Sequence, residues 1–221
     1  MISCMTRRSH IVLLGDSIFD NAAYTGGAPD VATHLRGLLP AGWNATLCAI
    51  DGATTRDLQR QVGRVPRDAT HLVISVGGND ALQNLDLLSL RVASSAEALE
   101  TCAARVLIFE RAYREAIRLA LRPGLPTIVC TIYNGALDRT IATAARLGLA
   151  LFNDAILRTA LDLHLDAIEL RAICTEPGDY ANPIEPSGQG GLKIAQAVAR
   201  AVGALDDGYP SRVWGEPRPR A

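Results

Sequence analysis

Short apolar runs alternate with amphipathic segments along this chain, and this alternation constrains the fold more than any other feature. Five runs have the length and composition of buried strands: residues 10–14, 44–50, 71–76, 127–131 and 166–170. Strands that alternate with helices imply a parallel sheet with right-handed crossovers and helices on both faces. We therefore predict an α/β fold, a three-layer α/β/α sandwich with a five-stranded parallel sheet and flavodoxin-like winding.

The segments between these runs carry apolar residues at helical spacing. The predicted helices cover about residues 29–39, 54–64, 94–121, 138–147, 149–163 and 189–205. No internal repeat and no interdomain linker is visible in the sequence. We predict one domain over residues 1–205 and a poorly ordered tail over residues 206–221, where glycine and proline are frequent.

The overall charge argues against nucleic acid and membrane partners. Lys and Arg number 22 and Asp and Glu number 23, so no basic field attracts nucleic acid or an anionic bilayer. No stretch approaches the roughly 20 apolar residues of a membrane span. Only nine residues precede the first predicted strand, too few for a signal peptide. Because five scattered cysteines also fit a reducing compartment, we expect a cytoplasmic protein.

The sequence predicts neither a metal nor a cofactor. The cysteines form no C-x-x-C pair, and neither G-x-G-x-x-G nor G-x-x-x-x-G-K-[ST] is present. A flavin-binding loop would need several Ser or Thr residues after the first strand, where this chain offers one. A receiver domain would need a lysine after the fifth strand, but the single lysine, Lys193, lies within the last predicted helix.

Four short polar motifs follow predicted strands. They are Gly-Asp-Ser at 15–17, Asp-Gly at 51–52, Gly-Gly-Asn-Asp at 77–80 and Asn-Pro-Ile-Glu-Pro-Ser at 182–187. The carboxyl ends of parallel strands share one edge of a sheet, and ligands bind along that edge. We therefore expect these distant motifs to meet at one cleft.

The residue types in these motifs suit acyl transfer, which needs a nucleophile, a base and donors for an oxyanion. Ser17 is the candidate nucleophile. Its backbone N–H, the N–H of Gly52 and the side-chain amide of Asn79 are candidates for an oxyanion hole. Asp16 is expected to bond nearby backbone amides across the turn, and Tyr133 is a candidate substrate contact.

These motifs, in this order, resemble the SGNH hydrolase superfamily, also called the GDSL esterase/lipase family. The resemblance spans about residues 11–202 and rests on the blocks at 15–17, 52 and 77–80. It implies an esterase, lipase, thioesterase or carbohydrate deacetylase that works without a metal. The implied substrate is a small acyl ester or an acetylated sugar.

The last block departs from the family pattern. That block reads Asp-x-x-His, with the histidine as general base, and here Asn182 and Glu185 stand at those positions. In one hypothesis Glu185 is the base and Asn182 orients it, because an amide can donate a hydrogen bond to a carboxylate. A free glutamate, with a pKa of about 4.3, is a weak base for a hydroxyl. Burial would have to raise the pKa of Glu185.

Two other hypotheses stay open. In the first, the chain has lost its chemistry and binds an acyl or glycan ligand. In the second, a histidine from elsewhere serves as the base. The topology disfavours the second, because three histidines fall at the sheet edge away from Ser17 and the fourth lies mid-helix: His10, His71, His164 and His34. The sequence leaves the oligomeric state open.

Overall fold

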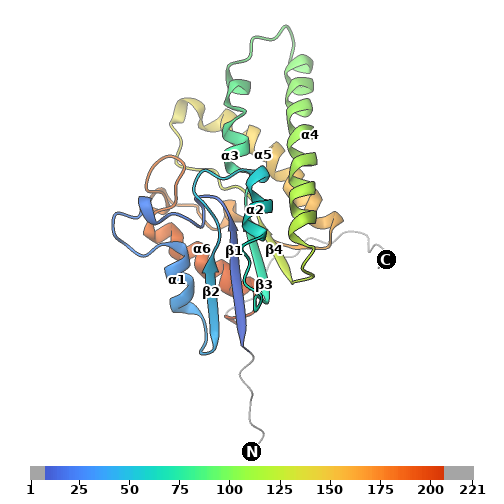
Figure 1. Cartoon of the computed structure of the whole chain (residues 1–221). Coiled ribbons are helices and arrows are strands. Elements are labelled where there is room, and N and C mark those ends of the chain that lie inside the picture. Colours follow the sequence, from blue (N-terminus) through green and yellow to red (C-terminus); the bar gives the residue numbers. More distant parts are fainter. Residues whose placement is uncertain (1–7, 207–221) are drawn as a thin grey trace, which may run out of the picture.

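The computed structural model of the chain describes residues 8–206, and its centre is a single parallel sheet. The strands are β1 (Ser9–Gly15), β2 (Trp43–Leu47), β3 (His71–Ser75), β4 (Thr127–Cys130) and β5 (Asp166–Ile168). Their order is β2-β1-β3-β4-β5, which confirms the predicted sheet and its flavodoxin-like winding. The carboxyl ends of the strands lie toward the top of Figure 1.

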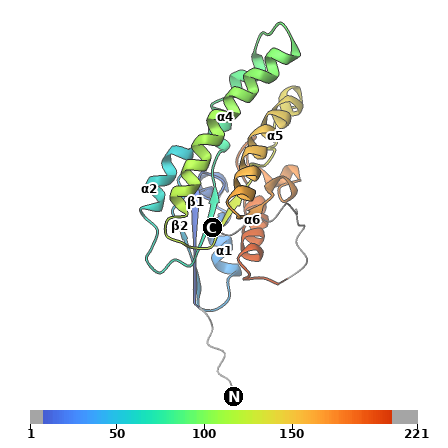
Figure 2. The same cartoon turned by 90° about the vertical axis from the view of Figure 1, so that its right-hand side faces the viewer.

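Helices cover both faces of the sheet (Figures 1 and 2). The α-helices are α1 (Val31–Leu38), α2 (Leu58–Val62), α3 (Gly78–Leu82), α4 (Ser95–Ala120), α5 (Arg139–Asp162) and α6 (Gly188–Ala201). Short 3-10 helices are η1 (Ala22–Tyr24), η2 (Thr55–Asp57), η3 (Leu85–Ser89), η4 (Leu170–Ala172) and η5 (Pro177–Asp179).

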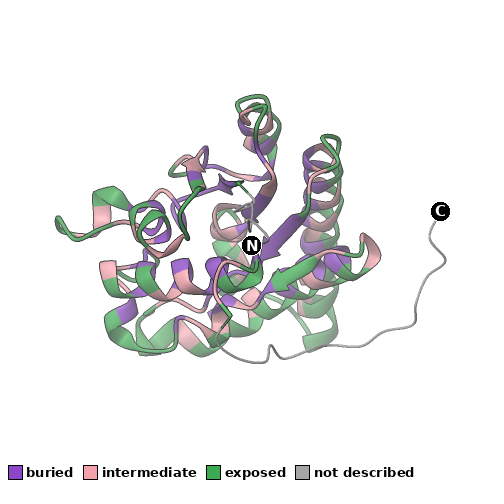
Figure 3. Cartoon of the chain, turned by 90° about the horizontal axis from the view of Figure 1, so that it is seen from below, coloured by how far each residue is buried: buried purple, intermediate pink, exposed green. Residues whose placement is uncertain are grey.

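Alternate residues of β1 point into two separate cores. Ile11 and Leu13 belong to the core under α1 and α6. Val12 and Leu14 belong to the core under α2, α4 and α5. Seen from below, the buried residues gather on the strands and on the inward sides of the helices (Figure 3). The period of two along a strand thus supplies both apolar layers of the sandwich.

Some predicted boundaries were wrong. The segments expected as two helices form one helix, α5, with Gly148 inside it. A glycine within a helix costs only about 1 kcal/mol relative to alanine, and the buried Phe152 and Ile156 hold the helix together across that position. The last helix ends at Ala201 rather than near residue 205. Apart from Asp206, the predicted tail lies outside the described residues.

Among the described residues, α5 is the one helix that could cross a membrane by length and composition. Its most apolar 18-residue window has a mean hydropathy of 1.3 and is 28% buried. One such helix is a weak indication, since core helices of soluble proteins pass the same test. Here the buried Asn153 ties α5 to the end of β4, because its side chain accepts from the N–H of Ile132 at 2.7 Å and donates to its carbonyl at 2.8 Å.

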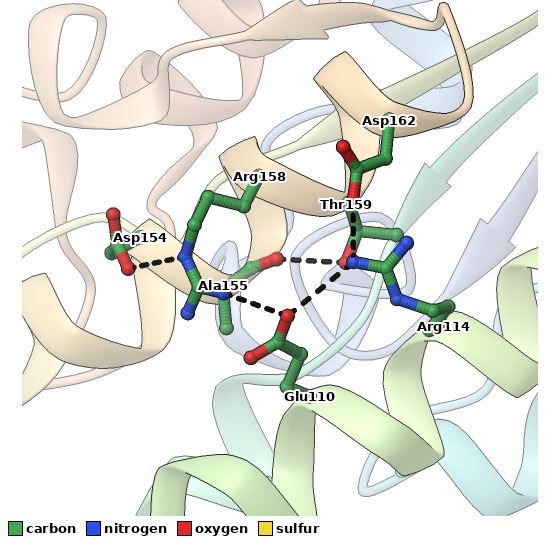
Figure 4. A network of polar contacts seen from close by, with 7 residues as sticks. All are labelled: Glu110, Arg114, Asp154, Ala155, Arg158, Thr159 and Asp162. Atoms are coloured by element: carbon green, nitrogen blue, oxygen red, sulfur yellow. Dashed lines mark hydrogen bonds and ion pairs between the residues drawn. The ribbon is translucent and has the colours of Figure 1, made fainter. Parts of the chain in front are cut away.

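Ion pairs join α4 to α5 (Figure 4). The carboxylate of Glu110 accepts from Arg158 at 2.8 Å and from Arg114 at 3.3 Å. Arg114 also pairs with Asp162 at 2.9 Å, and Arg158 with Asp154 at 2.7 Å. These contacts fix the two longest helices relative to each other. The guanidinium of Arg114 has both of its carboxylate partners, Glu110 and Asp162, within this chain.

Candidate active site

The first motif begins where β1 ends. Gly15 has φ +130°, and a Cβ there would lie 1.7 Å from the carbonyl oxygen of Ser75, so no other residue fits. The N–H of Asp16 donates to that same oxygen at 3.0 Å. The chain then turns and places Ser17 just beyond the edge of the sheet. As expected, the side chain of Asp16 accepts from a nearby amide, the N–H of Ile18, at 3.1 Å.

Gln61 is also part of this turn, although no sequence motif pointed to it. Its fully buried side chain on α2 accepts from the N–H of Gly15 and donates to the carbonyl of Gly15, both at 2.7 Å. A single amide therefore satisfies both backbone groups of the last residue of β1. A buried glutamine with both ends paired stiffens the support beneath Ser17.

Hydrogen bonds join the second motif to the segment that follows the first motif. The N–H of Asp51 donates to the carboxylate of Asp20 at 3.0 Å, and the hydroxyl of Tyr24 donates to the carboxylate of Asp51 at 2.6 Å. Gly52 follows in a left-handed conformation, with φ +76°. The loop after β2 is thus tied to the segment that follows Ser17.

The third motif lies at the same edge of the sheet and contacts the loop after β2. The side-chain amide of Asn79 donates to the carbonyl of Ala53 at 2.9 Å. The carboxylate of Asp80 accepts from the backbone N–H of Thr55 at 3.0 Å and from its hydroxyl at 2.7 Å. The loops after β2 and β3 are therefore one hydrogen-bonded unit.

The three candidate oxyanion donors each keep an unused N–H. In the described part of the chain, the backbone N–H groups of Ser17 and Gly52 donate no hydrogen bond. The amide of Asn79 has two N–H bonds, of which the contact with Ala53 uses one. Free donors of this kind can stabilise negative charge on a bound oxygen.

Glu185 lies beside Ser17 at the start of α6. Its carboxyl group is buried, with 6% of the residue exposed, and its Oε2 has no hydrogen-bond partner among the described residues. Burial raises the pKa of Glu185, a hydrogen bond with the Ser17 hydroxyl lowers it, and the charge of Asp51 raises it; the net pKa is raised. The fold therefore brings together the hydroxyl and the carboxylate that the sequence singled out, 168 positions apart.

Asn182 holds the backbone of this loop rather than the carboxylate. Its side-chain oxygen accepts from the N–H groups of Ile184 and Glu185, both at 2.9 Å. The expected hydrogen bond from its amide to the Glu185 carboxylate is not among the contacts of the described chain. Tyr133 supports the loop from β4, because its hydroxyl donates to the carbonyl of Ile184 at 2.6 Å.

A half-buried ion pair anchors the same loop to α6, and sequence reasoning missed it. Asp179 is fully buried, and Lys193 reaches it from α6 at 2.7 Å. Burial alone would raise the pKa of Asp179, but Lys193 and the N–H of Glu176 outweigh it, so the net pKa is lowered. The one sequence signal that could have pointed to this ion pair is that Lys193 is the single lysine of the chain.

The electrostatic surroundings of Ser17 are acidic. Burial raises the pKa of Asp16 to about 7, against the hydrogen bond from Ile18, and the charges of Glu185 and Asp80 raise it further. The second carboxylate oxygen of Asp16, Oδ2, is buried without a partner. Burial, and then the charges of Glu185 and Asp16, raise the pKa of Tyr133 well above its usual range. No basic residue is among the causes of these shifts.

None of the four histidines makes a described contact with Ser17 or Glu185. His10 contacts Thr46 at 2.7 Å and Asp68 at 3.1 Å near the start of β1. The other three lie at the start of β3, in α1 beside the Gly188 carbonyl, and between α5 and β5: His71, His34 and His164. The structure gives no support to a relocated imidazole.

The described residues offer no metal site, and the two cavities named here lie away from Ser17. In the described chain, no group of three or more His, Cys, Asp or Glu residues is arranged to hold a metal ion. One shallow cavity of about 370 Å³ lies at the opposite sheet edge beside His71 and His164. Another, of about 470 Å³, lies along α4 beside Arg111 and Arg118. Ser17 itself is only 8% exposed.

Comparisons with known proteins agree with the family resemblance and with the fold. The model of the GDSL-like lipase/acylhydrolase family matches residues 13–190. No curated protein sequence gives a significant match. An extracellular lipase from Streptomyces rimosus superimposes with a TM-score of 0.67 at 15% identity, over 87% of this chain and 99% of its own. An acetylxylan esterase from Geobacillus stearothermophilus, solved as a catalytic mutant, gives 0.63 at 18% identity, over 89% and 95%. At these identities the likeness shows a shared fold.

Proposed function

The chain belongs to the GDSL-like lipase/acylhydrolase family, and on that premise we propose that it hydrolyses carboxylic esters with Ser17 as nucleophile and Glu185 as general base. The observation that carries the proposal is that the buried Glu185 carboxyl lies close enough to the Ser17 hydroxyl for that hydroxyl to lower its pKa. A nucleophile in contact with a buried base is the arrangement that activates a serine. Asn182 and Tyr133 hold the loop that carries this base.

The proposed reaction has two balanced halves. As the Ser17 oxygen attacks the ester carbonyl carbon, its proton passes to Glu185 and the carbonyl electrons move onto oxygen. The N–H groups of Ser17 and Gly52 and the Asn79 amide bind this oxyanion. The bond to the leaving alcohol then breaks, and the alcohol takes the proton from Glu185. Water repeats the cycle, releases the carboxylic acid and returns the proton to Ser17.

The raised pKa of Glu185 makes this role feasible. A base must be ionised to accept a proton, and it becomes a stronger base as its pKa approaches the working pH. Burial raises the pKa of Glu185 and so moves it in that direction. We expect the rate to rise with pH through this pKa, because only the ionised carboxylate can take the proton of Ser17.

The acidic surroundings support a proposal for the substrate class. Asp20 and Asp51 lie in the loops beside Ser17, and the neighbours with related folds include enzymes named as a lipase and an acetylxylan esterase. The negative charges of these carboxylates would repel an anionic substrate. We therefore propose a neutral ester, such as a short acyl ester or an acetylated sugar, rather than an anionic one.

Among the described cysteines none forms a disulfide, which supports the further proposal of a cytoplasmic location.

Two features favour a second candidate, a ligand-binding protein without activity. Where the family resemblance places Asp-x-x-His, the chain has Asn182 and Glu185, and neither described cavity opens at Ser17. Such a protein would bind an acyl or glycan ligand at the same edge of the sheet. It would show no turnover and no covalent labelling of Ser17.

The deciding experiment is hydrolysis of p-nitrophenyl acetate across pH. Ser17→Ala should abolish turnover. Glu185→Gln should lower kcat by about 10²–10⁴-fold, the usual contribution of a general base, and leave far-UV circular dichroism unchanged. Glu115→Gln, a matched change on the exposed side of α4, should have no effect. Wild-type turnover in Glu185→Gln would exclude Glu185 as the base. An inactive wild type that a fluorophosphonate fails to label would establish the binding protein instead.

A further inference from the structure

Helix α4 carries two apolar stripes, and only one of them faces the rest of the described chain. The buried stripe includes Phe109, Tyr113 and Ile117, which pack on the sheet. The second stripe follows the spacing i, i+3, i+4, i+7, i+8, i+11 that places side chains on one helix face. We call it the exposed face of α4, and its members are Glu100, Ala103, Ala104, Leu107, Ile108 and Arg111.

All six residues of this face are exposed. Leu107 is 46% exposed and Ile108 is 65% exposed, although both are large and apolar. Figures 1 and 2 show α4 at the outer edge of the described chain, with its first half extending beyond the sheet. Glu100 and Arg111 form no ion pair with the described residues. A periodic apolar stripe without a cover is typical of a surface that binds a partner.

The charges at the two ends of the face favour a second copy of the same helix as the partner. Glu100 and Arg111 lie eleven residues apart, which is about 16 Å along a helix. A second α4 in the antiparallel direction, related by a twofold axis beside residues 105–106, would set Glu100 opposite the partner's Arg111 at both ends. Since a twofold axis repeats each contact, the face is complementary to itself.

The apolar centre fits the same register. About that axis Leu107 lies opposite the partner's Ala104, and Ile108 lies opposite the partner's Ala103. Large side chains facing small ones let two helices approach closely and interdigitate. The helix dipole explains neither end charge, because its influence fades within the first and last turn, and Glu100 and Arg111 both lie more than one turn from the ends of α4.

We propose that this protein forms a homodimer through the exposed faces of two antiparallel α4 helices. An anionic bilayer is a poorer occupant, because Glu97 and Glu100 both lie exposed near one end of the face. Two crossing helices bury less than the roughly 1,600 Å² of a standard interface. The dimer therefore dissociates on dilution.

The test is the mass of the full chain in solution over a range of concentration. From about 1 to about 200 µM, light scattering should show the mass rise from 23.5 kDa toward twice that value. Ile108→Glu should abolish the rise without changing the circular dichroism, since the side chain is exposed. Arg67→Glu, an exposed charge reversal in the loop before β3 and away from α4, should leave it unchanged. A monomer at the highest concentration, or a dimer indifferent to Ile108→Glu, would overturn the proposal.

Charge reversal tests the antiparallel register itself. Glu100→Arg alone and Arg111→Glu alone each place like charges opposite each other at both ends, and each should weaken dimerisation about tenfold or more. The double variant restores opposite charges and should recover the wild-type dissociation constant. A double variant as weak as the two single variants would refute the register.

Discussion

Replacing Asp16 by asparagine should change how the stability of this protein depends on pH. Burial raises the pKa of Asp16 from 3.8 to about 7. Between these pH values the folded protein holds a proton on Asp16 that the unfolded chain has lost. Folding therefore takes up a proton, and this carboxyl makes the protein less stable as the pH rises from about 4 to 7. Three pKa units correspond to about 4 kcal/mol, which is the upper limit of the effect.

Asparagine removes this dependence because it does not titrate. Its side-chain oxygen can keep the hydrogen bond from the N–H of Ile18, which measures 3.1 Å in the wild type. Its amide nitrogen would occupy the place of the unpartnered Oδ2, and a buried unpaired donor costs about 1–3 kcal/mol at every pH. The variant should be less stable than the wild type near pH 4, and the difference should shift in its favour by up to about 4 kcal/mol by pH 7.

The assay is urea unfolding of both proteins at intervals from about pH 4 to pH 8. Asp138→Asn provides a control: hydrogen bonds from Thr140 lower the pKa of Asp138 below 3.8, so the stability that its carboxylate contributes is lost only below about pH 4. The difference in stability between that variant and the wild type should therefore stay nearly constant from about pH 4 to pH 8. If the gap between Asp16→Asn and the wild type stays constant across the range, the buried carboxyl does not titrate as described.

Two further predictions follow from the geometry of the edge that carries Ser17. Gly15→Ala should prevent folding or lower the thermal midpoint sharply, because its Cβ would overlap the carbonyl oxygen of Ser75; a variant that melts like the wild type would contradict the backbone conformation of this turn. Asn79→Ala should lower kcat for p-nitrophenyl acetate by about 10²–10³-fold, the usual loss of an oxyanion donor, with a nearly unchanged KM. An unchanged kcat in a folded Asn79→Ala protein would remove this amide from the oxyanion hole.

The sequence was enough to predict the sheet and its motifs because those signals are local. Apolar runs set the strands, and parallel winding then brings Ser17, Gly52 and Asn79 to one edge without any side-chain detail. Helix α3 escaped prediction because its five residues, Gly78–Leu82, have the composition of a turn and no apolar period. Its existence depends on neighbouring segments, such as Asp80 receiving the hydrogen bonds of Thr55.

The finer contacts of the site depend on geometry that no local pattern encodes. Whether Asn182 offers its oxygen or its amide is decided by the path of the loop, which aims two backbone N–H groups at the oxygen. Gln61 contacts Gly15 across 46 positions of sequence, and Asp179 meets Lys193 only because η5 packs on α6. The local sequence around each of these residues does not predict the distant residue that it contacts.

The direction of β1 has a practical consequence for handling this protein. Ser9 opens the strand and Gly15 closes it, so the two ends stand about 20 Å apart at roughly 3.3 Å per residue. A tether joined ahead of Ser9 would attach the molecule to a bead or electrode by the edge opposite Ser17. Immobilised in that orientation, the protein would turn the edge that carries Ser17 toward the bulk liquid, and even a dense coating would leave that edge open to dissolved molecules.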